Sequence, residues 1–293
     1  MPEVLRIIVP PINDFSFKAV FAHLGPLIGL LQAFLGLPHE TFKGIFVADP
    51  NLNPDFEKGK HSILDLRART ATRDMNIEIQ RLFSPELLDR ILYYMARMMA
   101  GQLKWAEGYA GLPKTICILI ADFPIPQLKA GQYHYCFMFR DEKSGLVYPN
   151  SPDIHVLALP EIPEVDDGTP LWLWGRFLSS KTAEELEALR GRGADMAEAV
   201  DRLLEFSADE KERIRAEAHE KWLWDQAARE RQHVVMARQS REEGEAKGRA
   251  EGKAEEQTNI ALSMLRSDMS VANVAKFTGL SEAEVKRYAK ERK

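Results

Sequence analysis

The spacing of hydrophobic residues changes from a helical to a strand-like period near residue 44. Before this point the apolar side chains follow a helical period, Asn13 can cap a first helix, and Gly36 can end a second. After it, the segments IFVAD, HSILDLRART and MNIEIQRL are rich in strand-forming residues or alternate between apolar and polar positions. The pattern predicts two helices followed by three strands.

A third helix and more strands follow this group. Ser84-Pro85-Glu86 supplies a capping hydroxyl, a proline at the first helical position and an early acid, which together favour a helix start. One predicted face of this helix is apolar: Leu88, Leu92, Met95 and Met99. KTICILIADF then indicates a buried strand, and YHYCFMFR and DIHVLAL indicate two more. This order of elements predicts a mixed α/β domain.

The pattern becomes helical and highly charged from Lys181 onward. Glycines at 244, 248 and 252 each cost about 1 kcal/mol relative to alanine in a helix, so we expect a soft exposed helix or a linker there. Residues 257–293 contain three short helical patterns, with a turn at Gly279 and a capping box formed by Ser281 and Glu284. This arrangement is typical of a helix-turn-helix, and an oligomerisation or docking module is the alternative.

The chain therefore divides into three predicted parts. Residues 1–180 form the α/β domain, residues 181–256 an acidic helical extension with the glycine-punctuated linker, and residues 257–293 a small helix-turn-helix-like tail. The formal net charge of −5 is distributed unevenly, with +1 over residues 1–150, −9 over residues 151–256 and +3 over the tail. Because the acidity lies in the middle, either end of the chain could approach a phosphate backbone.

The composition is that of a globular protein, with 45% hydrophobic and 28% charged residues. Cys117 and Cys136 lie in apolar segments, and we expect them to be buried thiols in a reducing compartment. The N-terminus lacks the ordered features of a signal peptide, and the apolar region 19–37 is interrupted by polar residues, glycine and proline. We therefore expect a cytoplasmic protein that does not span a membrane.

Candidate chemistry lies on the predicted hairpin of the second and third strands. Because side chains alternate along a strand, Asp65 can share a face with Glu78, Asn76 and Gln80 when residue 65 pairs with residue 78. That register places both apolar sets of side chains against the core. The two carboxylates and the amide could then bind Mg²⁺. The alternative is that this polar face is only the solvated side of a sheet.

Other residue types give weaker signals. The seven histidines are scattered without metal-ligand spacing, so we expect structural or surface roles for them. The chain contains no GxSxG, P-loop or GxGxxG motif. Arg90, Tyr94 and Arg97 form a stripe on the third helix that could follow a phosphate backbone, and a solvated helix face is the alternative.

Several segments, in their order and spacing, resemble one nuclease superfamily. They are NDFSFK from Asn13, KHSILD ending at Asp65, MNIEIQ ending at Gln80, RILYYMARMMAGQLKWAEGY from Arg90, and PKTICILIADF from Pro113. Together they resemble the PD-(D/E)XK nuclease superfamily, and within it the recombination-promoting nuclease or putative transposase group. The resemblance covers roughly residues 12–178. It implies a restriction-endonuclease-like αβββαβ core and Mg²⁺-dependent endonucleolytic hydrolysis of DNA phosphodiesters, linked to recombination or mobile elements.

The resemblance also implies roles for individual residues. Asp65 matches the motif aspartate and Glu78 the (D/E), so both are expected to bind Mg²⁺ or Mn²⁺. Gln80 stands where the superfamily usually has lysine, and Lys18 is the candidate that supplies the missing positive charge. These four are the expected catalytic residues, and DNA is the expected partner. The expected DNA contacts are Arg90, Tyr94, Arg97, Lys286 and Arg287.

Two rival interpretations stay open. Glutamine is neither a cation nor a proton donor, so a protein of the same fold could be a catalytically inactive DNA-binding member. Alternatively, the protein could be a helical assembly protein that works through residues 181–256, with the sheet as a scaffold. A homo-oligomer, if one forms, is expected to assemble through the helical C-terminal region.

Overall fold

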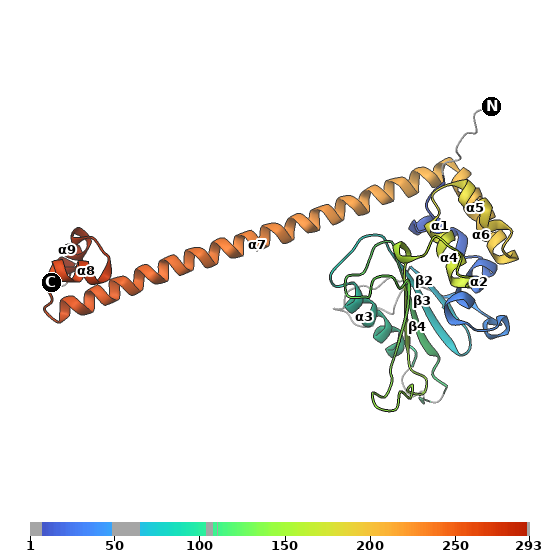
Figure 1. Cartoon of the computed structure of the whole chain (residues 1–293), viewed down its shortest axis with the longest axis horizontal. Helices are drawn as coiled ribbons and strands as arrows, with labels where there is room; N and C mark the ends of the chain where they lie inside the picture. The colour runs from blue at the N-terminus through green and yellow to red at the C-terminus, as the bar shows by residue number, and fades with distance from the viewer. Residues whose placement is uncertain (1–7, 49–64, 104–107, 110, 292–293) are drawn as a thin grey trace. The chain divides into compact units, whose positions relative to one another are not determined.

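The computed structural model describes residues 8–48, 65–103, 108–109 and 111–291 (Figure 1). Residues 61–64 of the predicted second strand lie outside the described residues. The chain forms two compact units, Met1–Trp222 and Leu223–Lys293. The sequence-based boundaries at residues 180 and 256 stay predictions.

The first two helices form where the apolar spacing predicts them. α1 (Asp14–Phe21) begins after Asn13, whose side chain accepts a hydrogen bond of 3.0 Å from the backbone N–H of Phe15. α2 (Leu24–Leu35) ends at Gly36, which adopts a left-handed φ of 62° that suits glycine. Most apolar side chains of both helices are buried, so the two helices contribute to the core of the first unit.

The apolar region of α1 and α2 serves this core. No single helix in the described part of the chain is long and apolar enough to cross a membrane. Only together do α1 and α2 have the length and apolar composition of a membrane-spanning segment, and the two helices are bent by 99° relative to each other. Leu27, Leu30 and Leu31 of α2 are fully buried inside the protein.

The described residues form a mixed sheet of six strands. These are β1 (Phe46–Ala48), β2 (Leu66–Arg69), β3 (Arg73–Gln80), β4 (Lys114–Ala121), β5 (His134–Met138) and β6 (Asp153–Ala158). They lie in the order β1-β2-β3-β4-β6-β5, in which β4 is parallel to both β3 and β6 and the other neighbouring pairs are antiparallel. The α/β mixed sheet predicted from the sequence is confirmed.

The β2–β3 hairpin has the predicted register. Leu66 lies opposite Ile77 and Arg67 opposite Asn76, which is the register that pairs position 65 with position 78. The polar face, however, is not the solvated side of the sheet. Asp74 and Asn76 are fully buried and Glu78 is only 3% exposed. The interpretation of this face as a solvent-facing surface is therefore wrong, because a helix covers it.

That helix is α3 (Leu87–Ala100), and its buried face differs from the predicted one. Leu92 and Met99 are exposed, whereas the residues in the core are Leu87, Ile91, Met95 and Met98. The segment is apolar on several sides, so its spacing could not distinguish the two neighbouring stripes. The helix begins after Glu86 and not after Ser84, and the Glu86 side chain makes no capping hydrogen bond within the described residues.

Helices cover both faces of the sheet, as Figure 1 shows. α3 packs on one face against side chains of β4 and β6. α1, α2 and α4 (Pro170–Ser179) lie on the other face, with α5 (Ala183–Arg190) and α6 (Ala194–Ala208) packed against them. This three-layer arrangement completes the predicted αβββαβ core, and it places the polar residues of β2 and β3 between the sheet and α3.

The second unit contains the helices predicted for the tail. α7 (Glu210–Arg266) ends here, followed by α8 (Val271–Thr278) and α9 (Glu282–Glu291). Gly279 turns the chain with a φ of 73°, and Ser281 and Glu284 exchange the hydrogen bonds of a capping box. The small core of this unit consists of Ala261, Leu265, Val274 and Val285.

Candidate active site

Asp65 and Glu78 contact each other's strands at the end of the β2–β3 hairpin. The backbone N–H of Asp65 donates to Oε1 of Glu78 at 3.3 Å. In return, the backbone N–H of Ile79 donates to Oδ2 of Asp65 at 2.8 Å. Each carboxylate is thus fixed by the backbone of the opposite strand. The predicted register brings the two acids together, and these hydrogen bonds hold them there.

A buried amide orients the second carboxylate. Nδ2 of Asn76 donates to Oε1 of Glu78 at 3.0 Å, while Oδ1 of Asn76 is buried without a hydrogen-bond partner. Among the described residues, Oδ1 of Asp65 and Oε2 of Glu78 also accept no hydrogen bond. A buried acceptor normally has a partner, so Oδ1 of Asn76 leaves the site short of a donor or a positive charge.

Burial disfavours ionisation of both acids, and a nearby negative charge adds to this effect on each of them. Burial is the main cause that raises the pKa of Asp65 to about 6, and the nearby charge of Asp14 raises it further. Burial and the charge of Asp65 raise the pKa of Glu78 to about 8. The half-buried carboxylate of Asp65 and the buried carboxylate of Glu78 offer only oxygen ligands, which fit a hard divalent cation such as Mg²⁺ or Mn²⁺.

Arg90 of α3 brings a cation to the position where Gln80 lacks one. Its Nη2 donates to Oε1 of Gln80 at 2.5 Å, and its charge lowers the pKa of both Asp65 and Glu78. Nε of Arg90 is buried and has no hydrogen-bond partner in the part of the chain that the structure describes. Because α3 covers the polar face of the sheet, its arginine lies inside the site and not only on an outer helix surface.

α1 contributes one negative and one positive side chain near Asp65. Asp14 and Lys18 are one helical turn apart, and the charges of both act on Asp65. Lys18 is exposed, whereas Asp14 is half-buried. The sequence pattern predicted Lys18 as a residue of the site but did not indicate Asp14. The available signal was an acid placed four residues before that lysine in NDFSFK.

Four other residues are candidates for DNA contacts. Tyr94 is half-buried beside Arg90, and burial raises its pKa. The guanidinium of Arg97 lies over the ring of Tyr93, 5.9 Å from its centroid. Two further candidates, Lys286 and Arg287, belong to the second unit and are exposed on α9.

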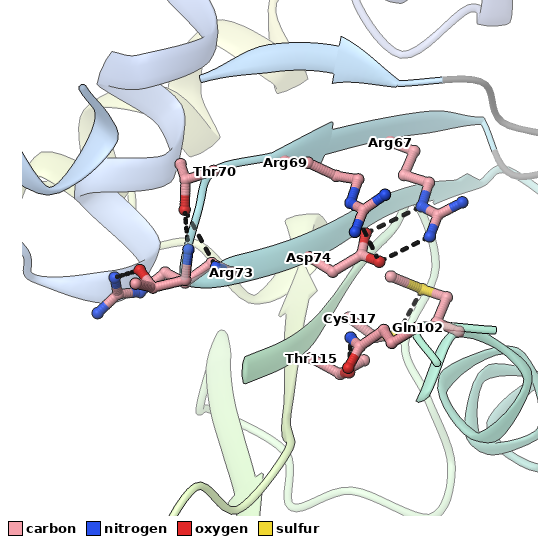
Figure 2. Close-up of polar contacts among 10 residues, drawn as sticks. Arg67, Arg69, Thr70, Arg73, Asp74, Gln102, Thr115 and Cys117 are labelled. Atoms are coloured by element: carbon pink, nitrogen blue, oxygen red, sulfur yellow. Dashed lines mark hydrogen bonds and ion pairs between the residues drawn. The ribbon is translucent and has the colours of Figure 1, made fainter. Parts of the chain in front are cut away.

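The arginines of β2 are bound elsewhere in the hairpin. Figure 2 shows Arg67 and Arg69 converging on the buried carboxylate of Asp74. Arg67 makes two hydrogen bonds to it, of 2.9 and 2.6 Å, in the bidentate geometry that favours an arginine–carboxylate pair. The charge of Arg67 is therefore committed to Asp74, and Asp65 and Glu78 depend on other cations.

A cavity of about 510 Å³ lies at the ends of the parallel strands. Arg81 follows β3, Asp122 follows β4, and the cations Arg176 and Lys181 also line the cavity. Nη2 of Arg81 donates to Glu220 at 2.9 Å, while its Nε is buried without a partner. Carboxyl ends of parallel strands commonly form ligand sites, and this one directly follows Gln80 in the chain.

Comparisons with known proteins agree with this arrangement. A family model described as PD-(D/E)XK nuclease family transposase matches residues 11–232. No curated protein and no solved structure matches the chain. The matched residues include the whole sheet, α3 and the helices that cover the opposite face. The chain therefore belongs to the PD-(D/E)XK nuclease family transposases.

Proposed function

We propose that this protein is a metal-dependent DNA endonuclease that hydrolyses phosphodiester bonds in recombination or in the movement of mobile elements. The observation that carries the proposal is the meeting of two carboxylates, the half-buried Asp65 and the buried Glu78, both with raised pKa values and each with one oxygen that accepts no hydrogen bond from the described residues, beside the half-buried Arg90. Such a site costs stability unless it binds a cation, and perturbed buried acids of this kind are concentrated at functional sites.

Asp65 and Glu78 are the proposed ligands of Mg²⁺ or Mn²⁺. When bound there, the metal would lower the pKa of a water molecule and stabilise negative charge on the phosphate. Asn76 keeps Oε1 of Glu78 in place by its hydrogen bond of 3.0 Å, so that the second oxygen stays available. The backbone N–H of Ile79 has the same effect on Asp65.

Arg90 is the proposed replacement for the lysine that the family motif usually carries. Gln80 accepts a hydrogen bond from Nη2 of Arg90, which holds the half-buried guanidinium at the site, where its other terminal N–H groups could donate to a phosphate oxygen. A guanidinium does not lose its proton in proteins, so this role is to stabilise charge and not to transfer protons. Lys18 is the second proposed cation, with a smaller effect because it is exposed.

The cavity beyond Gln80 is a proposed contact for a neighbouring phosphate of the DNA. Arg176 and Lys181 line it together with Arg81, whose Nε lacks a partner. Contacts of this kind fix the register of the DNA and do not read its sequence. Tyr94, Arg97, Lys286 and Arg287 are proposed as additional contacts. The proposal places the reaction in the cytoplasm and includes homo-oligomer formation through the helical C-terminal region.

An inactive DNA-binding member is the second candidate function, and the presence of Gln80 in place of lysine favours it. Incubation of purified protein with supercoiled plasmid in Mg²⁺, Mn²⁺ or EDTA separates the two functions. An endonuclease nicks or linearises the plasmid with either metal and does nothing in EDTA. A protein that retards the plasmid in a gel without cleaving it in any of the three conditions is the inactive member.

A further inference from the structure

A second group of metal-binding side chains lies on the edge of the sheet, away from the carboxylate pair. Cys136 of β5 lies directly opposite His155 of β6, and Asp153 is two residues before His155 on the same strand. Alternate residues of a strand share a face, so all three side chains lie on one side of the sheet. The ring of His155 lies 6.0 Å from that of Phe34 on α2, which identifies the face opposite to α3.

The three ligand atoms are close enough to share one ion. Sγ of Cys136, a ring nitrogen of His155 and a carboxylate oxygen of Asp153 all lie within 4.8 Å of one another. The distance from Sγ to Nε2 of His155 is 3.7 Å. A tetrahedral zinc ion at about 2.3 Å from sulfur and about 2.0 Å from nitrogen separates these ligands by roughly 3.5 Å, so little movement is needed.

A buried oxygen of Asp153 lacks a hydrogen-bond partner. Asp153 is 8% exposed, and its Oδ1 has no partner within the described part of the chain. Its other oxygen, Oδ2, pairs with Nζ of Lys114 at 2.6 Å. Lys114 therefore orients the carboxylate without satisfying Oδ1. A buried anionic oxygen without a hydrogen-bond partner, beside a thiol and an imidazole, is suited to bind a cation.

His134 orients the imidazole of His155. Its Nε2 lies 3.0 Å from Nδ1 of His155, and the two rings stack with an angle of 9° between them. This contact occupies Nδ1 and leaves Nε2 directed to Cys136, as an outer hydrogen bond does for metal-bound histidines.

We propose that Cys136, His155 and Asp153 bind a zinc ion, with His134 as a positioning residue. The combination of thiolate, imidazole and carboxylate suits zinc, and three protein ligands leave one position for water. Binding converts the Cys136 thiol to the thiolate and releases its proton to solvent. Cys136 is exposed, which gives the ion a route into the site and corrects the expectation that both thiols are buried.

The ion would fasten an edge strand to its neighbour. β5 pairs only with β6 in the described sheet, and Phe137 and Met138 beyond Cys136 are exposed. A ligand from each strand makes the β5–β6 pairing depend on the metal. The site lies on the opposite face of the sheet from Asp65 and Glu78, so it is independent of the proposed nuclease chemistry.

Titration of the metal-free, reduced full-length protein with Co²⁺ tests the site by its absorption spectrum. We expect one equivalent of Co²⁺ to produce a sulfur-to-cobalt charge-transfer band in the near ultraviolet, and Zn²⁺ to remove it. Cys136→Ser should abolish the band, whereas Cys117→Ala, which removes the other thiol, should retain it. A wild-type protein without the band, or a Cys136→Ser variant with it, would overturn the proposal.

Two further variants distinguish the positioning role and the independence of the site. His134→Ala should weaken zinc binding by about tenfold or more in a competition titration, because outer hydrogen bonds tune metal affinity to that extent. Unchanged affinity would remove His134 from the site. The double variant Asp65→Asn with Glu78→Gln should keep the thiolate band. Loss of the band in that variant would show that the zinc site does not stand apart from the carboxylate pair.

Discussion

Glu78 is buried, carries a carboxylate and lies beside a second acid, which is an arrangement that opposes folding when no cation is bound. Its raised pKa means that the folded state prefers the protonated acid, whereas the unfolded chain ionises near the usual value of 4.5. The stabilising contribution is therefore present below pH 4.5 and is lost as the pH rises through about 8. If the site binds a divalent cation as proposed, the loss of stability at neutral pH accompanies its affinity for that cation.

This linkage predicts the behaviour of Glu78→Gln without metal. In EDTA, the melting temperature of the wild type should fall between pH 5 and pH 8, and that of Glu78→Gln should fall less because the amide stays neutral. The amide keeps the oxygen that accepts from Asn76. Glu142→Gln, on the exposed surface, is the control and should behave like the wild type. If the melting temperatures of all three proteins fell equally between pH 5 and pH 8, ionisation of Glu78 would not be the cause of the lost stability.

Arg90 is predicted to contribute directly to the rate of the reaction. Removal of one preorganised charge-stabilising donor typically costs on the order of 10²-fold in rate, so Arg90→Ala should lower the cleavage rate at saturating DNA by about that factor. Arg97→Ala changes an arginine of the same helix that stacks on Tyr93, and it should weaken DNA binding without lowering the saturated rate. Single-turnover rates and Kd values measure both effects.

Substitutions of Lys18 and Gln80 test which residue supplies the positive charge at the proposed active site. Lys18→Ala should lower the rate by less than about tenfold, or about 1.4 kcal/mol, because the exposed charge is screened by water. Gln80→Lys combined with Arg90→Ala should recover part of the lost activity by returning a cation to the site. If Lys18→Ala lowered the cleavage rate by much more than tenfold and Arg90→Ala left the rate unchanged, the positive charge at the site would come from α1 and not from α3.

At the scale of elements, the sequence was sufficient to predict a helix or a strand register where the local pattern of residues was compatible with only one structure. The register of β2 and β3 followed from alternation, because a shift of one residue would have turned Ile77 toward the wrong face. The capping residues Asn13 and Gly36 set the bounds of α1 and α2 for similar local reasons. The close approach of Asp65 and Glu78 was predictable from this register.

Other features depended on which elements pack together, and no local pattern contains that information. The contact of Arg90 with Gln80 requires α3 to lie over the hairpin. Cys136 lies beside His155 only because β5 pairs with β6. The segments HYC and DIH each place two possible metal ligands at alternate positions, but neither segment indicates that the two strands are neighbours. The approach of Asp14 to Asp65 likewise depends on the placement of α1.

The orientation of α3 can be tested by paired substitutions. Ile91 is 1% exposed and Leu92 is 49% exposed, although the spacing of apolar residues favoured Leu92 as a core position. Ile91→Ala should lower the free energy of unfolding by about 2 to 5 kcal/mol, and Leu92→Ala by less than about 0.5 kcal/mol. Chemical denaturation measures both. Equal losses, or a larger loss for Leu92→Ala, would mean that the helix buries the other stripe.

At the scale of the whole molecule, the proposed catalytic residues and the basic tail belong to different compact units. A chain that ends at Trp222 keeps Glu220, the partner of Arg81, and should retain metal-dependent cleavage. Loss of residues 223–293, which have a net charge of +2 (14 Lys+Arg against 12 Asp+Glu) and include the tail with +3, should weaken DNA binding and reduce its dependence on salt concentration. The full chain with Lys286→Ala and Arg287→Ala is the matched variant and should reproduce part of both changes.

The same truncation tests assembly of the protein. Light scattering should show a smaller oligomer for the truncated chain than for the full chain, since the helical C-terminal region is the proposed contact. Unchanged DNA binding across a salt titration, together with a smaller oligomer, would identify residues 223–293 as an assembly module and not as a DNA-binding one.

The central claim is that Asp65 and Glu78 form the metal site of a working nuclease. The most direct measurement compares cleavage of supercoiled plasmid by the folded wild type and by folded Asp65→Asn, each with Mg²⁺ and with EDTA. We predict cleavage by the wild type with Mg²⁺ alone, and a rate on the order of 10²-fold lower for Asp65→Asn, since loss of a metal ligand removes the charge stabilisation that the metal provides. Cleavage by the wild type in EDTA, or an Asp65→Asn variant as fast as the wild type, would contradict the claim.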